Sequence, residues 1–180
     1  YYDIEIDKVN APQRPLPSGR MKRQNALYLS LVLYFIGLVS SSLVGSAFLG
    51  AAIFNSVLSY MYASTFKKMP IFSNIVVSFL ATSVYVAASF VSGFSISAKV
   101  AILALMSFSG MMAREIIKDV EDLKGDKKGG AIKLPSVIGE RNATRVSRLF
   151  SLIAIATVPL PYLWGYVTVP YLVFSIPGAL

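Results

Sequence analysis

Two groups of aspartates are the residues of this chain best suited to chemistry. Asp3 and Asp7 lie four residues apart, so on a helix their side chains would share one face, about 5–6 Å apart at Cβ. Asp119, Asp122 and Asp126 have the i, i+3, i+7 spacing of one helical face. Like charges placed this way repel each other, and a divalent cation would offset the repulsion. Because Mg²⁺ bridges carboxylates to substrate phosphates, the five aspartates predict a magnesium site.

Basic side chains flank both acidic clusters and are suited to an anionic ligand. Carboxylates that hold a metal beside Lys and Arg that hold phosphate oxygens would fit a magnesium–diphosphate ligand. Three prolines exclude a long helix over residues 10–19 and favour an extended loop that presents basic side chains, although a plain linker stays possible. The candidate diphosphate-binding residues are Lys8, Arg14, Arg20, Lys67 and Lys118.

The composition removes other catalytic groups. The sequence contains 0 His and 0 Cys, so the commonest general base and the usual zinc ligands are missing. Neither acidic cluster has the glycine-rich form of a nucleotide phosphate loop. Any catalysis by these residues must therefore use carboxylates, hydroxyls, Lys, Arg or a bound metal.

Long segments without charge predict that the chain spans a membrane several times. The sequence is 55% hydrophobic and only 14% charged, with a mean hydropathy of +0.63. A spanning helix needs about 20 apolar residues. We expect an all-α transmembrane bundle with about six spans. Two of these spans lie in 24–66, separated by a turn near Ser40–Ser42 and Gly45. Three more lie near 70–90, 97–113 and 149–163. The last is a partial span after a turn at 161–165.

The distribution of basic residues supports this topology. All but one of the 17 Lys and Arg residues fall on one side of the membrane if the spans are placed as above. The exception is Lys99. All nine acidic residues lie on the same side as the basic loops. Because Lys and Arg are enriched in cytoplasmic loops, we expect the charged face to be cytoplasmic in an integral protein of the cell membrane.

The two acidic segments resemble the aspartate-rich motifs of the UbiA superfamily of intramembrane prenyltransferases. The segments are YYDIEIDKVNAPQRPLPSG and REIIKDVEDLKGDKKGG, separated by four predicted spans. The resemblance implies that Asp3 and Asp7 match the first motif, whose Asn is missing here, and that Asp119, Asp122 and Asp126 match the second. It also implies that Tyr62 and Lys67, on a loop between the motifs, contact the diphosphate. The family has nine spans, so we expect a single domain over 1–180 that is truncated at both ends.

The resemblance implies a Mg²⁺-dependent transfer of a prenyl group from an isoprenoid diphosphate to a lipophilic acceptor. In the superfamily both Asp-rich motifs bind Mg²⁺ and the diphosphate. The RPLPSG and DVEDLKGD forms are most similar to archaeal digeranylgeranylglyceryl phosphate synthases. That similarity favours geranylgeranyl diphosphate as donor and geranylgeranylglyceryl phosphate as acceptor, in archaeal ether-lipid synthesis. An aromatic or quinone-precursor acceptor is the alternative within the superfamily.

Three interpretations other than prenyl transfer stay open. Each acidic cluster alone could be a solvated helix end neutralised by lysines, as Lys118 or Lys124 could do for Glu115 and Asp119. An ion-coupled transporter is disfavoured because such proteins place ionisable residues within spans, and the predicted spans contain none beyond Lys99 near one end. A membrane diphosphatase would use water as the acceptor. Oligomeric state is not predicted by any of these patterns.

Overall fold

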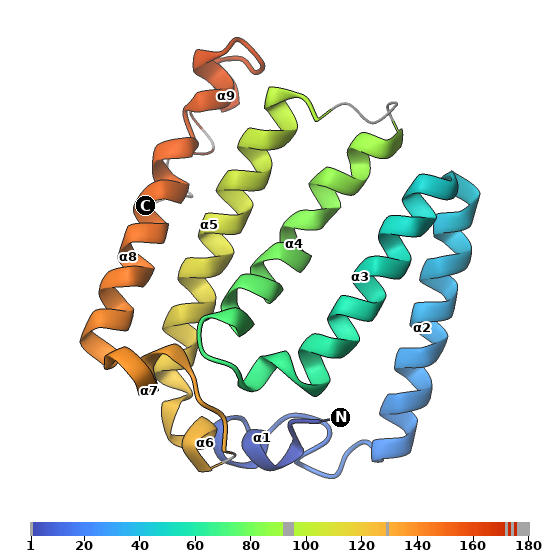
Figure 1. The fold of residues 1–180 in the computed structure, drawn as a ribbon, viewed down its shortest axis with the longest axis vertical. Helices are drawn as coiled ribbons and strands as arrows, with labels where there is room; N and C mark the ends of the chain where they lie inside the picture. The colour runs from blue at the N-terminus through green and yellow to red at the C-terminus, as the bar shows by residue number, and fades with distance from the viewer. Residues whose placement is uncertain (1, 92–95, 129, 172, 174, 176–180) are drawn as a thin grey trace.

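The computed structural model describes residues 2–91, 96–128, 130–171, 173 and 175. Within these ranges the chain is helical and has no strand. Five long helices run side by side; the short helices α1, α6 and α7 lie at one end of them and α9 lies at the other (Figure 1). In chain order the helices are α1 (Ile4–Asn10), α2 (Arg23–Val44), α3 (Ser46–Ser64), the 3₁₀ turn η1 (Phe66–Lys68), α4 (Phe72–Val91), α5 (Ala98–Glu121), α6 (Leu123–Lys128), α7 (Leu134–Ile138), α8 (Glu140–Thr157) and α9 (Leu160–Leu163).

The long helices confirm the predicted transmembrane bundle. Five helical segments are long and apolar enough to cross a membrane: 23–44, 46–64, 72–90, 98–121 and 140–163. Each long helix packs against the next one, from α2 through α3, α4 and α5 to α8. Many of their large apolar side chains are exposed in the structure, as expected for helices whose solvent is lipid. The protein is therefore an integral membrane protein.

The turn between the first two spans lies at the predicted place. α2 ends at Val44 and α3 begins at Ser46, with Gly45 at φ 152° between them. Residues that have a side chain rarely adopt this backbone conformation, so glycine suits the point where the chain reverses direction. The sequence prediction of two spans within 24–66 is confirmed.

Two spans extend further than predicted. α5 continues past Ala113 to Glu121, and α8 begins at Glu140 rather than near Leu149. A helix does not have to end where the hydrocarbon ends, because its backbone hydrogen bonds continue equally well in water. The predicted partial span after residue 165 falls largely on residues outside the described ones.

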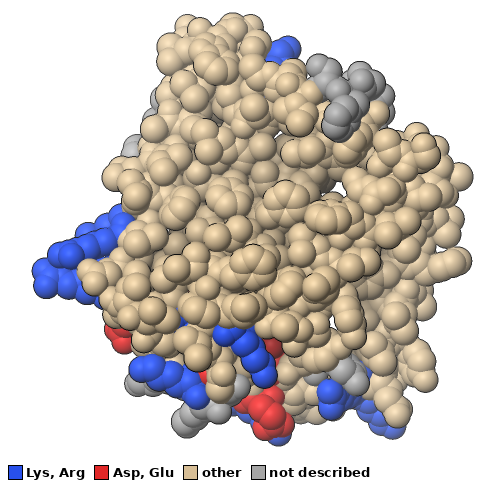
Figure 2. All heavy atoms as spheres, in the orientation of Figure 1, with Lys and Arg blue, Asp and Glu red and all other residues tan. Residues whose placement is uncertain are grey.

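Charged side chains gather at one end of the bundle. The start of α2, the connection between α3 and α4, the end of α5 and the start of α8 all lie at the end where α1 and α6 are found (Figure 1). Figure 2 shows nearly all visible blue and red atoms in the lower part of the molecule and a single small blue group at the top. The grouping of charge at one end agrees with the predicted topology.

A small apolar core holds the charged ends of α5, α7 and α8 together. Its buried residues come from all three helices, and Phe108, Val146 and Phe150 pack around them. Ser147 of α8 donates a hydrogen bond of 2.8 Å to the carbonyl of Ala113 in α5, so the two helices approach closely. The buried core residues are Met112, Ile116, Leu134 and Ala143. This packing fixes the segment that carries the second acidic cluster.

Candidate active site

The second acidic cluster does not lie on one continuous helical face. α5 ends at Glu121, and α6 begins at Leu123. Asp122 is the residue between them and has φ −83° and ψ 0°. The expectation that Asp119, Asp122 and Asp126 share one face of a helix is therefore wrong. Closely spaced carboxylates repel each other within a helix and favour such a break, and the break turns Asp126 away from the axis of α5.

The two acidic segments nevertheless meet, although more than a hundred residues separate them in the sequence. α1 packs directly against α6. The side-chain amide of Asn10 donates a hydrogen bond of 3.3 Å to the carbonyl of Asp122. A Cβ atom on Gly125 would lie only 2.0 Å from Oδ1 of Asn10, so the contact requires glycine at this position.

A small cavity of about 60 Å³ joins residues of both clusters. Asp3 of the first and Asp126 of the second line it, together with Lys67 from η1 and Lys133 from the segment before α7. Lys67 forms an ion pair with Asp3. Carboxylates and ammonium groups from four separate segments therefore surround one space. The predicted ligand contacts of Asp3, Asp126 and Lys67 stay predictions.

Asp119 lies beside this cavity in a buried polar network. Its Oδ2 accepts a hydrogen bond of 2.8 Å from the Asn74 amide, and its Oδ1 lies 3.2 Å from Nζ of Lys133. Lys133 also donates to Oγ of Ser73 at 3.4 Å. The side chains of Asp119 and Lys133 are 9% and 5% exposed. Removing one partner of such a buried ion pair strongly destabilises the folded protein, because the other charge is left without compensation.

The buried position of Asp126 disfavours its charged form. Burial raises the pKa of this carboxyl to about 6, and the nearby Asp119 and Asp122 carboxylates also raise it. The Lys133 and Lys67 ammonium groups lower it but do not fully compensate. A further positive charge at this cavity would therefore stabilise the carboxylate.

Tyr62 also lies near the carboxylates, but it belongs to a helix and not to the loop expected from the resemblance. It belongs to the last turns of α3 and is partly buried. Glu115, Asp119, Asp3 and Asp126 are all close enough to act electrostatically on its side chain. The position of Tyr62 is therefore compatible with contact to a ligand in the cavity.

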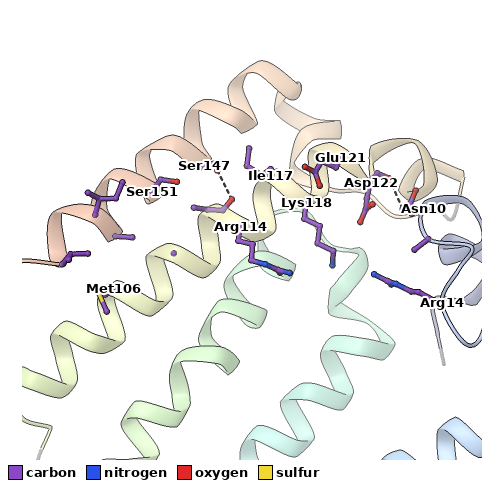
Figure 3. A pocket seen from close by; sticks show the side chains of 16 residues that line it. Asn10, Arg14, Met106, Arg114, Ile117, Lys118, Glu121, Asp122, Ser147 and Ser151 are labelled. Atoms are coloured by element: carbon purple, nitrogen blue, oxygen red, sulfur yellow. Dashed lines mark hydrogen bonds between the residues drawn. The ribbon is translucent and has the colours of Figure 1, made fainter. Parts of the chain in front are cut away.

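A second and much larger cavity, of about 840 Å³, lies between α5, α8 and the loop after α1 (Figure 3). Arg14, Lys118 and Asp122 line it, together with Arg114. Arg14 forms an ion pair of 2.7 Å with Asp7. Of the predicted site residues, Asp3, Asp126 and Lys67 thus line the small cavity, whereas Arg14, Lys118 and Asp122 line the large one.

Two predicted diphosphate-binding residues point elsewhere in the structure. Lys8 is exposed and pairs with Glu5 at 2.8 Å. Arg20 donates to Oγ of Ser18 at 3.1 Å and to the carbonyl of Gln13, so it holds the proline-rich loop together. Their contact with a ligand stays a prediction.

Asn74 and Lys133 belong to the site although no sequence pattern predicts it. Asn74 falls in a predicted apolar span, and Lys133 lies in a basic loop. An available signal for Asn74 was its place among apolar residues at the start of a span, because an amide there needs buried partners. Lys133 offered no local signal, since its partner Asp119 is reached only through the fold.

The carboxylates fit a magnesium ion that is shared with a ligand better than one held by protein alone. Among the described residues, no group of three acidic side chains converges as a ready-made metal site. Mg²⁺ in phosphate-binding enzymes commonly takes only one or two carboxylates and completes its shell with water and phosphate oxygens. The uncompensated Asp126 beside Asp3 suits that arrangement.

The fold and the site together define a class of protein. It is a membrane-embedded helical bundle with acidic and basic side chains from distant segments gathered at one membrane boundary. Residues 1–180 match the UbiA prenyltransferase family over their whole length. The chain belongs to this family.

Known relatives agree with the family assignment. The chain is 40% identical over 172 residues to the digeranylgeranylglyceryl phosphate synthase of Methanococcoides burtonii. The aligned residues make up 96% of this chain and 61% of the relative. It is 37% identical to the synthase of the same name from Methanopyrus kandleri, over 99% of this chain and 65% of the relative. The chain thus spans less than two thirds of the length of these relatives.

Solved structures show the same fold. A structure described as giving insight into digeranylgeranylglyceryl phosphate synthase in membranes has a TM-score of 0.68 at 35% identity, over 96% of this chain and 61% of that one. A UbiA homologue from Archaeoglobus fulgidus, bound to DMAPP and Mg²⁺, has a TM-score of 0.74 at 19% identity, over 99% of this chain and 65% of that one. At that low identity the second likeness speaks for the fold alone.

Proposed function

We propose that the protein transfers a prenyl group from an isoprenoid diphosphate to a lipophilic acceptor, with Mg²⁺ as cofactor. The observation that carries the proposal is the shared cavity of Asp3 and Asp126, with Lys67 and Lys133 at its walls. Relatives that are 35–40% identical are named digeranylgeranylglyceryl phosphate synthases, which supports geranylgeranyl diphosphate as donor and geranylgeranylglyceryl phosphate as acceptor.

The proposed metal ligands are Asp3, Asp7, Asp119, Asp122 and Asp126 in one domain over 1–180. Mg²⁺ bound there would neutralise the negative charge that grows on the departing diphosphate. Asp126 and Asp3 need only small changes to face a common ion, because they already line the same cavity. Asp119 is held by Asn74 and Lys133, so its contribution is the most restricted.

Side chains of the protein would stabilise the leaving group and position it. Lys67, in the 3₁₀ turn η1 between α3 and α4, would exchange its contact with Asp3 for a diphosphate oxygen. Lys133 would add a second buried positive charge, and the Tyr62 hydroxyl would donate a hydrogen bond. Preorganised positive charge at the leaving group is the main source of rate acceleration in this scheme.

The reaction breaks the allylic carbon–oxygen bond of the donor and forms a carbon–oxygen bond to the acceptor. Diphosphate leaves with the bonding electron pair, and the acceptor hydroxyl attacks the allylic carbon. The proton of that hydroxyl would pass to a carboxylate, because the chain has 0 His.

We place the site on the cytoplasmic side of the cell membrane. The charged end of the bundle carries the basic loops, and Lys and Arg are enriched on the cytoplasmic side of membrane proteins. The donor and acceptor are both amphiphiles, so a site at the membrane boundary lets their chains remain in an apolar environment.

The experiment that tests the proposal is prenyl transfer by the full-length protein in detergent or lipid nanodiscs. Radiolabelled geranylgeranyl diphosphate and a geranylgeranylglyceryl phosphate acceptor would be supplied with Mg²⁺, and products separated by chromatography. We expect a doubly prenylated product that disappears with EDTA. Free prenol as the only product would indicate a diphosphatase, and the absence of any Mg²⁺-dependent product would contradict the proposal.

A further inference from the structure

The large cavity has a charged end and an apolar end. Arg14, Arg114 and Lys118 line it at the level where α5 leaves the membrane, and Met106 and Val158 line it further along the helices. From Met106 to Lys118 the axis of α5 rises by about 18 Å, at 1.5 Å per residue. The volume of about 840 Å³ is in the range of pockets that enclose organic ligands.

Three basic side chains from two separate segments face this cavity. Figure 3 shows Arg114 and Lys118 extending from α5 toward the side where Arg14 enters from the loop after α1. Arg14 pairs with Asp7, and Arg114 lies 2.5 Å from Glu115. Among the described residues, Lys118 has no ion pair within 4 Å, so its charge is available to a ligand.

Acidic side chains also reach the cavity and offset part of this charge, since Arg14 and Arg114 are paired and only Lys118 has no ion pair among the described residues. Glu121 is exposed, and Asp122 belongs to the proposed metal set, where a cation would occupy its carboxylate. A phosphate group would then meet Arg14, Arg114 and Lys118 on the remaining side. Arg is well suited to such contact, because its planar guanidinium can donate two parallel hydrogen bonds to phosphate oxygens.

The remaining walls of the cavity are apolar or small. Gly110, Ala113 and Ala154 leave space between α5 and α8, and Ile155 and Val158 supply an apolar surface. An occupant with a phosphate at one end and a hydrocarbon chain at the other would match both parts of the cavity. A free phosphate would use only the basic end.

We propose that the large cavity is the acceptor site, in which Arg14, Arg114 and Lys118 bind the phosphate monoester of the acceptor and the α5–α8 wall receives its chain. This inference rests on the proposed prenyl transfer. It separates the acceptor phosphate from the donor diphosphate, which belongs to the small cavity with Lys67 and Lys133. α1 lies between the two, since Asp3 lines the small cavity and Asn10 the large one.

The test compares two acceptors, geranylgeranylglyceryl phosphate and the same lipid without its phosphate. Lys118→Gln and Arg114→Gln in the full-length protein should each raise KM for the phosphate-bearing acceptor by about tenfold, as expected for loss of one charge-assisted hydrogen bond. KM for the donor and for the phosphate-free acceptor should not change. Arg148→Gln is the matched control, because Arg148 is an exposed residue of α8 that does not line the cavity.

A second readout does not depend on turnover. Calorimetric titration with glycerol phosphate should show binding to the wild type and to Arg148→Gln, and much weaker binding to Lys118→Gln. Arg114→Lys keeps the charge and should retain most of the binding, whereas Arg114→Gln also leaves Glu115 without its partner. Lys118→Gln has no such side effect among the described contacts.

Several results would overturn the inference. A rise in donor KM would mean that these side chains bind the donor, and an equal loss with both acceptors would indicate a structural role. If anionic lipid in the nanodiscs alters the variants while the acceptor KM stays the same, the occupant is a membrane lipid. Failure of the proposed function looks different, because the wild type would then transfer no prenyl group to either acceptor.

Discussion

The two cavities contain the same kinds of charged side chain but hold them differently. Around the small cavity the charges come from distant segments and pair with each other, as Lys67 does with Asp3 and Lys133 with Asp119. Around the large cavity Lys118 has no ion pair among the described residues, and an apolar wall lies nearby. Charges that are paired across distant segments around a small cavity suit a metal with a highly charged group, whereas an unpaired lysine beside an apolar wall suits an amphiphile.

The largest effect should come from the carboxylates of the small cavity. Asp126→Asn or Asp3→Asn should reduce prenyl transfer by about a thousandfold or more, because each removes a negative charge proposed to bind Mg²⁺. Turnover is measured with saturating Mg²⁺, and circular dichroism and size exclusion report whether the variant is folded. Full Mg²⁺-dependent activity in either folded variant would break the distinction between the cavities.

The buried pair of Lys133 and Asp119 should affect stability as well as activity. Lys133→Met leaves the Asp119 carboxylate buried without its cation, which should lower the free energy of unfolding by about 3 kcal/mol. Thermal unfolding in detergent measures this change. Asp119→Asn in the same chain should restore most of the stability but not the activity. An unchanged melting temperature in Lys133→Met would show that the pair does not form.

The pH dependence of both stability and prenyl transfer should reflect the titration of Asp126. Its pKa is about 6 in the folded protein and 3.8 for an ordinary carboxyl, so between these values the folded state retains a proton that the unfolded state has released. Without divalent cations, stability should therefore fall as pH rises through this window, by about 1–3 kcal/mol in total. At limiting Mg²⁺, prenyl transfer should instead fall as pH drops through about 6, because the protonated Asp126 carboxyl binds the metal poorly.

Asp126→Asn provides the check on this assignment. In chemical unfolding without divalent cations, the variant should lose the decrease in stability between pH 4 and pH 6. The same slope in wild type and variant would assign the titration to another group.

A substitution at the contact between α1 and α6 should have a smaller effect on turnover and stability. Gly125→Ala places a Cβ atom 2.0 Å from Oδ1 of Asn10, so the two helices must separate or the Asn10 side chain must move. We expect roughly tenfold lower turnover and about 1 kcal/mol lower stability. Asn10→Ala removes the obstructing atoms, so the double variant should recover most of both. No recovery would mean that this contact does not position the motifs.

The smallest effect concerns the residues that point away from both cavities. Lys8→Gln and Arg20→Gln should change the donor KM by less than about twofold, because Lys8 pairs with Glu5 and Arg20 holds its own loop. Steady-state kinetics with varied donor concentration measure this. A tenfold increase in KM would favour the sequence prediction that these two side chains contact the diphosphate.

Much of the fold could be predicted because lipid imposes simple rules on sequence. The uncharged segments and Gly45 predicted the first two spans, and the basic loops predicted which ends lie together. The helix break at Asp122 could not be predicted, since i, i+3, i+7 spacing fits a continuous helix equally well. The partner of Lys133 was also hidden, because it depends on how α5 packs beside the segment before α7.

The candidate site was predictable in its residue types but not in its division. Spacing alone grouped Arg14 and Lys118 with Lys67, and nothing in the sequence places them in separate cavities. That separation follows from the path of the chain around α1, because Asp3 before it lines the small cavity and Asn10 and Arg14 at and after its end line the large one. Packing between distant segments therefore determines which cavity each of these side chains lines, and local sequence patterns do not.

The central claim is that Asp3 and Asp126 share one metal and diphosphate site. An experimental structure of the full-length protein with Mn²⁺ and a non-hydrolysable isoprenoid diphosphate analogue tests it most directly, because Mn²⁺ can be located by its anomalous scattering. We expect Mn²⁺ bound between the Asp3 and Asp126 carboxylates, with Lys67 and Lys133 on the diphosphate oxygens. Mn²⁺ or diphosphate bound away from either aspartate, or α1 and α6 lying apart, would contradict it.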